Sequence, residues 1–188
     1  MNTNRNSILA AILVFLLGPV PAVQATTLAR MSLDELAAAA HVIVEAYCLE
    51  NEARWERGEI WTFTNLEVTE TIKGVAPRLI TVRLLGGRVG HLISTVNGVP
   101  RFQPGEDVVL FLERTPAGDF SVTSWVQGTF RIRRDPQTGR KAVTQDSAGA
   151  GVFDPATRRF HTSGIRNLPV EVFRQRLAET LERQSRGR

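Results

Sequence analysis

The sequence predicts a mainly β fold, a small OB-like β-barrel that is closed or partly open, with a short N-terminal helix and a C-terminal amphipathic helix. Five consecutive apolar residues at 108–112 follow a Pro-Gly turn, as in a strand buried on both faces. Segments on either side alternate apolar with polar residues, as half-buried strands do. A helical repeat of apolar residues lies near the end of the chain. The same strand spacing also allows an open sandwich.

Residues 1–25 are predicted to be a signal peptide, because Arg5 precedes an apolar run at 8–17 and small residues occupy a cleavage site ending at Ala25. A membrane anchor is the competing interpretation, but the run is only half of the roughly 20 residues that a spanning helix needs. We therefore expect a secreted or periplasmic protein with no stable membrane insertion after cleavage. Residues 26–188 are then one β-rich domain.

Cys48 is the only cysteine, so the exported chain has no internal disulfide and must be stable through packing. It falls in phase with apolar strand residues, which favours a buried thiol over a reactive or intermolecular one. Removing Arg5 lowers the net charge from +4 to +3, which is not a nucleic-acid-binding profile. Arginines are frequent late in the chain, where they form either a solvated face or a surface for anionic envelope components.

The N-terminal elements follow from local patterns. Ser32 and Glu35 form a capping-box pattern that predicts a helix at 33–40. Residues 42–50 then alternate as a first strand, and 51–59 are polar and predicted to be a loop. Residues 60–72 are long for one strand, and their apolar phase shifts near Thr64–Asn65, which indicates a β-bulge.

The remaining strands are bounded by turn signals. Strands are predicted at 79–85 and 91–96, with Asn97–Gly98 as a hairpin turn leading into the central strand. Further strands are expected at 120–126, 129–133, 140–144 and 158–162, and two Asp-Pro turns indicate peripheral hairpins. Residues 146–151 are predicted to be a flexible connector. Apolar residues after Pro169 recur at helical spacing, which predicts a helix over about 169–183 that packs on the sheet.

The residues that catalysis requires are not grouped in any recognised motif. His41, His91 and His161 lack metal-ligand spacing, and no nucleophile elbow accompanies a serine. We expect no enzymatic turnover, no cofactor and no metal. An enzyme of unusual mechanism is the rival class, and a concave cluster of strongly perturbed ionisable residues would signal it.

Two segments carry side chains that are typical of binding hot spots. Arg54 and Trp55 lie in the polar connector, while Arg88 and His91 flank the glycine cluster at 86–90. In a barrel these segments are expected to share one rim. The predicted partner is an extracytoplasmic protein, a protease among the candidates, or an anionic glycan.

Three segments resemble netrin-like modules, which include tissue inhibitors of metalloproteinases: Val-Ile-Val-Glu-Ala at 42–46, Thr-Ile-Lys-Gly at 71–74, and 105–112. The resemblance covers about 42–134 and implies an OB-type barrel with helices packed outside. Family inhibitors present a disulfide-held cysteine at the mature N-terminus to the protease metal. Here that residue is predicted to be Thr26, and the cysteine framework is absent. The function expected is a secreted, non-enzymatic binding module, with a netrin-like protease inhibitor or a passive envelope scaffold as alternatives.

Overall fold

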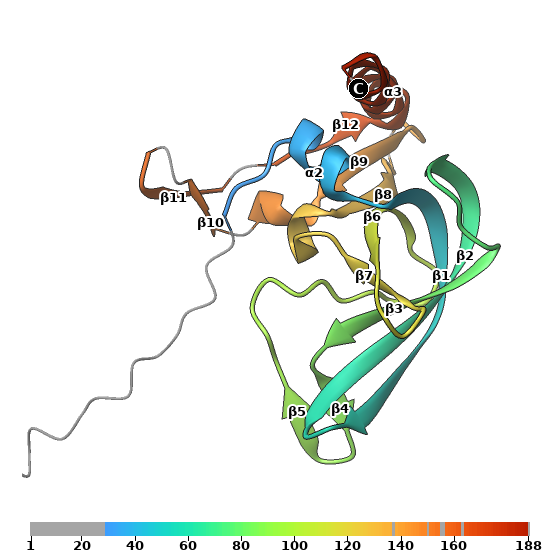
Figure 1. Ribbon diagram of the computed structural model, residues 1–188, viewed down its shortest axis with the longest axis vertical. Helices are drawn as coiled ribbons and strands as arrows, with labels where there is room; N and C mark the ends of the chain where they lie inside the picture. Colours follow the sequence, from blue (N-terminus) through green and yellow to red (C-terminus); the bar gives the residue numbers. More distant parts are fainter. Residues whose placement is uncertain (1–28, 137, 150, 155–156, 163, 188) are drawn as a thin grey trace, which may run out of the picture.

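The computed structural model describes residues 29–136, 138–149, 151–154, 157–162 and 164–187, so the predicted signal peptide lies outside the described residues. The described chain is mainly β with two α-helices, a short one near the N-terminus and a longer one at the C-terminus (Figure 1). This confirms the predicted fold class at that level. The helices are α2, Leu33–Ala39, and α3, Val170–Arg186; two 3-10 helices, η1 and η2, span Trp125–Gln127 and Asp146–Gly149.

One large sheet and two small ones contain the described strands. The strands are β1 Val42–Glu56, β2 Glu59–Lys73, β3 Leu79–Leu85, β4 Gly87–Val89, β5 Leu92–Ser94, β6 Asp107–Arg114, β7 Phe120–Val122, β8 Thr129–Arg134, β9 Lys141–Gln145, β10 Gly151–Asp154, β11 Arg159–Thr162 and β12 Leu168–Pro169. The large sheet has the order β1-β2-β3-β7-β6-β8-β9-β12, and β1 also pairs with β6. The β3–β7 pair is parallel and rests on one residue pair, Val82 and Phe120. Strand pairing therefore runs in a ring through β1, β2, β3, β7 and β6.

Strand β6 is the central strand that the apolar run predicts. It pairs with β1, β7 and β8. Val108, Leu110 and Leu112 face one apolar cluster, and Val109 and Phe111 face another. Because successive side chains point to opposite faces, a continuous apolar run is what a strand between two cores requires.

The predicted loop at 51–59 is wrong, because β1 and β2 form one long hairpin that includes these residues. Arg57 and Gly58 form its turn with φ of 51° and 90°, as a two-residue hairpin turn requires. This part of the hairpin extends beyond the core, so most of its side chains are polar and its composition resembles that of a loop. The expected bulge is present opposite Asn65, but the extra residue is Leu49 of β1.

Three further boundaries differ from the prediction. Asn97–Gly98 is a turn but not a hairpin, because β5 pairs with β4 and not with β6. Strand β7 ends at Val122, where the chain turns into the η1 helix. In the predicted flexible connector, η2 is ordered and buries Ser147 and Ala148. Ser147 is polar and Ala148 is small, so neither side chain signals burial, and their burial depends on contacts with distant parts of the chain.

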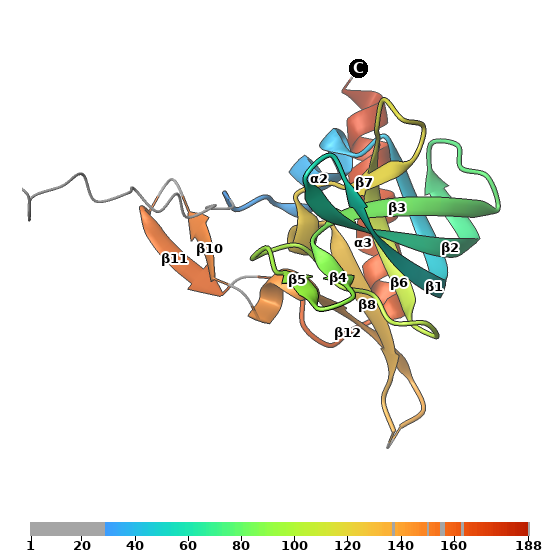
Figure 2. The same cartoon turned by 90° about the horizontal axis from the view of Figure 1, so that it is seen from below.

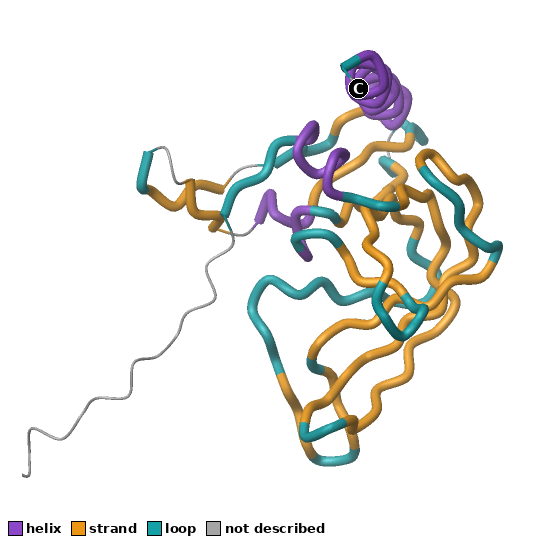
Figure 3. Tube along the Cα trace, viewed as in Figure 1, coloured by secondary structure: helices purple, strands orange, loops and turns teal. Residues whose placement is uncertain are grey.

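The two helices pack together on the apolar cluster that contains Val109 and Phe111, which we call the second core. They lie away from the β4–β5 hairpin (Figure 3). The capping box of α2 is present, with Ser32 and Glu35 each bonded to the other's backbone N–H. On the sheet side, Phe130 lies between Phe111 and Phe173, with ring centroids 5.2 and 5.0 Å apart. The predicted packing of the C-terminal helix on the sheet is confirmed. The helix runs to Arg186, past the predicted end at Arg183.

Candidate functional site

The β4–β5 hairpin crosses the β1–β2 hairpin at Gly87. A Cβ atom on Gly87 would lie 2.4 Å from Thr62 Oγ1 and 3.2 Å from Ala53 Cβ. The backbone φ of Gly87 is +143°. Only glycine permits this approach. The adjacent Gly86 donates its N–H to the Ile60 carbonyl at 2.6 Å and accepts from Thr62 Oγ1 at 2.7 Å. The glycine cluster is therefore a tight β-connection that joins two hairpins.

Arg101 holds both ends of the β4–β5 hairpin. Its guanidinium donates to the carbonyl oxygens of Leu85 at 3.2 Å, Gly86 at 3.1 Å and Ser94 at 3.5 Å. Burial lowers the pKa of Arg101, and no carboxylate of the described residues lies within ion-pair distance of it. The main-chain carbonyls take the place of a counter-ion.

The structure places the four predicted binding residues on the two hairpins that cross at Gly87, although Arg54 faces away from the crossing. Trp55 faces the same side of β1 as Ala53, which is the side that β4 crosses, and it is 55% exposed. Arg88 and His91 are exposed and lie on the β4–β5 hairpin. This hairpin lies at the end of the molecule away from the C-terminal helix (Figure 1). Arg54 faces the other side of β1, because neighbouring strand residues alternate. Its guanidinium lies 4.2 Å from the centroid of the Phe63 ring.

Two apolar residues that sequence reasoning missed lie beside the predicted ones. Leu92 and Ile93 of β5 are 46% and 63% exposed. Their only sequence signal was their position directly after His91 in a short strand. We call Trp55, Arg88, His91, Leu92 and Ile93 the hairpin end. It combines an aromatic side chain of β1 with arginine and aliphatic side chains of the β4–β5 hairpin, a composition that is typical of protein-binding surfaces.

A pocket of about 360 Å³ lies on the other side of the β1–β2–β3 sheet, between Trp61 and Trp125. Arg83 lines it, with its guanidinium 4.1 Å from the centroid of the Trp61 ring. Ser124 and Trp125 have φ of 49° and 51°, which is strained for residues with side chains. Sequence reasoning placed Trp61 and Trp125 in ordinary strands, 64 positions apart, and had no signal that they meet.

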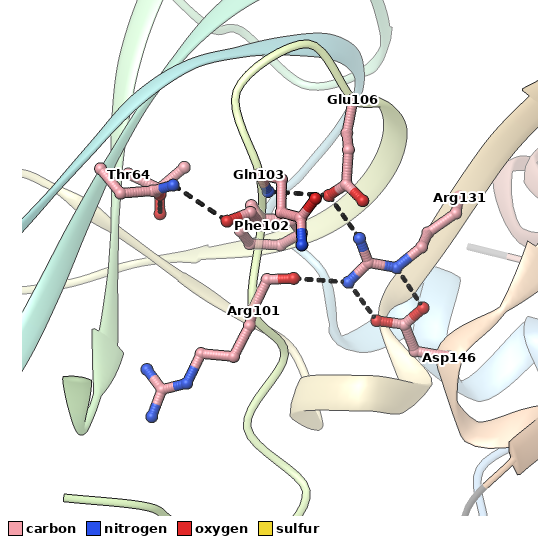
Figure 4. A network of polar contacts seen from close by, with 8 residues as sticks. Thr64, Arg101, Phe102, Gln103, Glu106, Arg131 and Asp146 are labelled. Carbon is pink, nitrogen blue, oxygen red and sulfur yellow. Dashed lines mark hydrogen bonds and ion pairs between the residues drawn. The ribbon is translucent and has the colours of Figure 1, made fainter. Parts of the chain in front are cut away.

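A charged network anchors the loop that carries Arg101 (Figure 4). Arg131 binds Asp146 through Nε at 2.7 Å and Nη2 at 2.9 Å, pairs with Glu106, and donates to the Arg101 carbonyl at 2.7 Å. Burial lowers the pKa of Arg131, but the Asp146 and Glu106 carboxylates outweigh burial and raise it. The network joins β8, η2 and the chain before β6 into one support for the hairpin end.

Cys48 is buried, as the sequence predicts, and lies next to this network. Burial raises the pKa of its thiol to about 11, and the Glu106 carboxylate adds to the rise. We expect the folded thiol to resist iodoacetamide at about pH 8 and to react once guanidinium unfolds the chain. Rapid alkylation of the folded protein would instead support the alternative of a reactive cysteine.

The pH dependence of stability follows from the same shift. Folding raises the pKa of Cys48 from 9.0 to about 11, so the proton on this thiol stabilises the fold fully below pH 9. That stabilisation is lost as the pH rises through about 11. Chemical denaturation across this range measures it, with Cys48→Ala as the control that lacks the thiol.

No group of three or more histidine, cysteine or acidic residues that could hold a metal ion occurs among the described residues. Within the same part of the chain, no helix is long and apolar enough to cross a membrane. The sequence matches no known family model, and neither a curated protein nor a solved structure shows significant similarity to it.

Proposed function

We propose that the protein is a secreted or periplasmic, non-enzymatic binding module that recognises an extracytoplasmic protein through the hairpin end. The single observation that carries the proposal is the crossing at Gly87, which brings exposed Trp55 to the same end of the molecule as Arg88 and Ile93. Large apolar side chains on a preformed surface bind with little loss of conformational freedom. Aromatic and arginine residues of this kind supply most of the energy in protein interfaces.

The fold proposed for this module is a partly open, OB-like barrel. It is supported by the ring of pairings β1-β2-β3-β7-β6 and by the antiparallel β1–β6 pair. The parallel β3–β7 pair is limited to one residue pair, which leaves the ring loosely closed there. OB domains bind ligands with the face of strands 2 and 3 and with the loop between strands 1 and 2. By this analogy of fold alone, the tip of the β1–β2 hairpin is at a binding position.

The alternatives are a netrin-like protease inhibitor and a passive envelope scaffold. An inhibitor that inserts its N-terminus needs a free end, but the side chain of Gln127 binds the Met31 N–H at 2.8 Å and the Ala29 carbonyl at 2.7 Å. That clamp begins three residues after the predicted Thr26 start, which favours recognition through the hairpin end. An anionic glycan is the other partner class, and the hairpin end has too few cations for it.

Affinity capture with the mature protein tests the proposal. Envelope and secreted fractions are passed over the immobilised protein, and the affinity of a captured partner is measured for Trp55→Ala and Arg88→Ala. We expect each substitution to weaken binding roughly 30-fold, the effect of losing a hot spot of about 2 kcal/mol. Phe160→Ala is the matched control, because Phe160 is an exposed aromatic residue, 64% exposed, on the separate β10–β11 hairpin.

The outcomes distinguish the binding module from the passive scaffold and from the netrin-like inhibitor. If both substitutions leave the affinity within about threefold, the hairpin end is the wrong surface. If no saturable partner is captured from any fraction, the passive scaffold replaces the binding module. Inhibition of a captured protease that survives Trp55→Ala would favour the N-terminal mechanism of the netrin-like inhibitors.

A further inference from the structure

A basic pocket of about 460 Å³ lies between the β8–β9 hairpin and the segment that leads into α3. The hairpin projects from the body of the molecule (Figure 2). The cations that line the pocket are Arg133, Arg134, Arg140 and Lys141. Asp135 is the one acidic residue among the described lining residues, so positive charge dominates. No part of the hairpin end lines this pocket.

The arrangement of these cations is unfavourable in the absence of a counter-ion. Arg134 lies directly opposite Lys141 across the two strands, and like charges in opposed positions destabilise a sheet. Arg134 donates to the Gly139 carbonyl at 2.7 Å, which fixes its guanidinium. Lys141 lies 3.6 Å from Asp107, a pair whose side chains are 41% and 40% exposed and which is therefore weak. Among the described residues no carboxylate forms an ion pair with Arg133, Arg134 or Arg140.

The frame of the pocket is ordered by hydrogen bonds of its own. In the hairpin turn, Asp135 accepts from the Thr138 N–H at 2.8 Å, and its own N–H donates to the Arg140 carbonyl at 2.8 Å. On the opposite wall, the Asn167 N–H donates to Thr144 Oγ1 at 3.1 Å, and that hydroxyl donates to Asn167 Oδ1 at 3.2 Å. The cations are therefore presented from one ordered hairpin, opposite a wall that is also held by hydrogen bonds, which reduces the ordering cost of binding.

We infer that this pocket binds an anionic glycan, a sugar chain that carries sulfate or phosphate groups. Guanidinium groups bind such oxyanions through paired hydrogen bonds, and three arginines with one lysine match several anionic groups along a chain. The apolar residues of the lining are Pro136, Ala142 and Pro169, whose side chains are short. No large apolar side chain is present there to enter a bilayer, which argues against a lipid surface as the source of the anions.

Calorimetry with a heparin-derived hexasaccharide, a sulfated glycan probe, tests the inference on the mature protein. We expect saturable binding that weakens with added salt, as binding between exposed charges does. The double variant Arg133→Gln/Arg140→Gln is expected to lose at least about tenfold in affinity, since it removes two charge-assisted contacts. The control is Arg159→Gln/Arg176→Gln, which removes the same charge from two exposed arginines outside the pocket. This control is expected to change affinity by less than about threefold.

Three results would overturn the inference. Equal losses in the two double variants would show attraction to net charge alone. Equal binding of the desulfated hexasaccharide would remove the role of the anionic groups. Vesicles of phosphatidylglycerol that bind through the same two arginines and outcompete the sulfated probe would assign the pocket to a lipid surface. Circular dichroism of each variant checks that the fold is unchanged. Trp55→Ala leaves this pocket intact, so its glycan binding distinguishes a failure of this inference from a failure of the proposed protein-binding function.

Discussion

Replacing Phe130 with alanine is expected to lower the free energy of unfolding by about 3–5 kcal/mol, the range for a buried phenylalanine. The Phe130 side chain is fully buried and lies between Phe111 of the sheet and Phe173 of α3. The substitution removes the ring that joins the two, so the loss combines apolar transfer with an unfilled cavity. Urea denaturation followed by circular dichroism measures the change.

Phe160→Ala is the matched control for this substitution. Phe160 loses the same atoms, but its side chain is 64% exposed on the β10–β11 hairpin. We expect its free energy of unfolding to change by no more than about 1 kcal/mol. A loss below about 1 kcal/mol for Phe130→Ala as well would contradict the second core as the structural link between α3 and the sheet.

The second large effect is expected at Arg131. Arg131→Met keeps much of the side-chain length but leaves the Glu106 and Asp146 carboxylates without their shared cation. These side chains are only 25% and 16% exposed, so they are partly shielded from water. Removing one partner of a buried ion pair leaves an uncompensated charge, and we expect a loss of about 3 kcal/mol in the free energy of unfolding.

Arg78→Met provides the comparison that isolates burial. Arg78 and Glu67 also meet at 2.7 Å, the separation of Arg131 Nε from Asp146, but the Arg78 side chain is 83% exposed. An exposed pair is stabilising by at most about 1 kcal/mol. Equal effects of the two substitutions would mean that the Arg131 network is no more protected from solvent than a surface pair.

The Arg131 substitution also connects stability to the proposed binding surface. Arg131 donates to the Arg101 carbonyl, and the Arg101 guanidinium holds both ends of the β4–β5 hairpin. Loss of this support does not change Arg88 or Ile93 themselves, but it leaves the hairpin that carries them less ordered. A weaker partner affinity in Arg131→Met, at a temperature where the variant is folded, is the expected functional consequence.

The hairpin end and the basic pocket are built on different elements. The hairpin end lies on the β1–β2 and β4–β5 hairpins, and the basic pocket lies between the β8–β9 hairpin and the segment that precedes α3. Their substitutions share no contacts among the described residues, so their effects on separate ligands are expected to be independent. Together, the two proposals describe a module that holds a protein partner near an anionic glycan.

Local sequence determined the elements whose patterns are strong and short-range. The apolar run around Val109 predicts β6, because a strand between two cores is apolar on both faces. The Ser32–Glu35 spacing predicts the start of α2, since both bonds of the capping box form within one turn. The apolar repeat through Phe173 predicts α3 in the same way.

Only the tertiary structure decided the sites. Arg54 and Trp55 carry polar neighbours that imitate a loop, yet they form a strand because pairing with β2 satisfies their backbone groups. The approach at Gly87 and the partners of Arg131, 25 and 15 residues away, depend on how distant segments cross. Pairing over such separations leaves no periodic trace in the sequence, since each residue satisfies its own strand pattern whichever segment it meets.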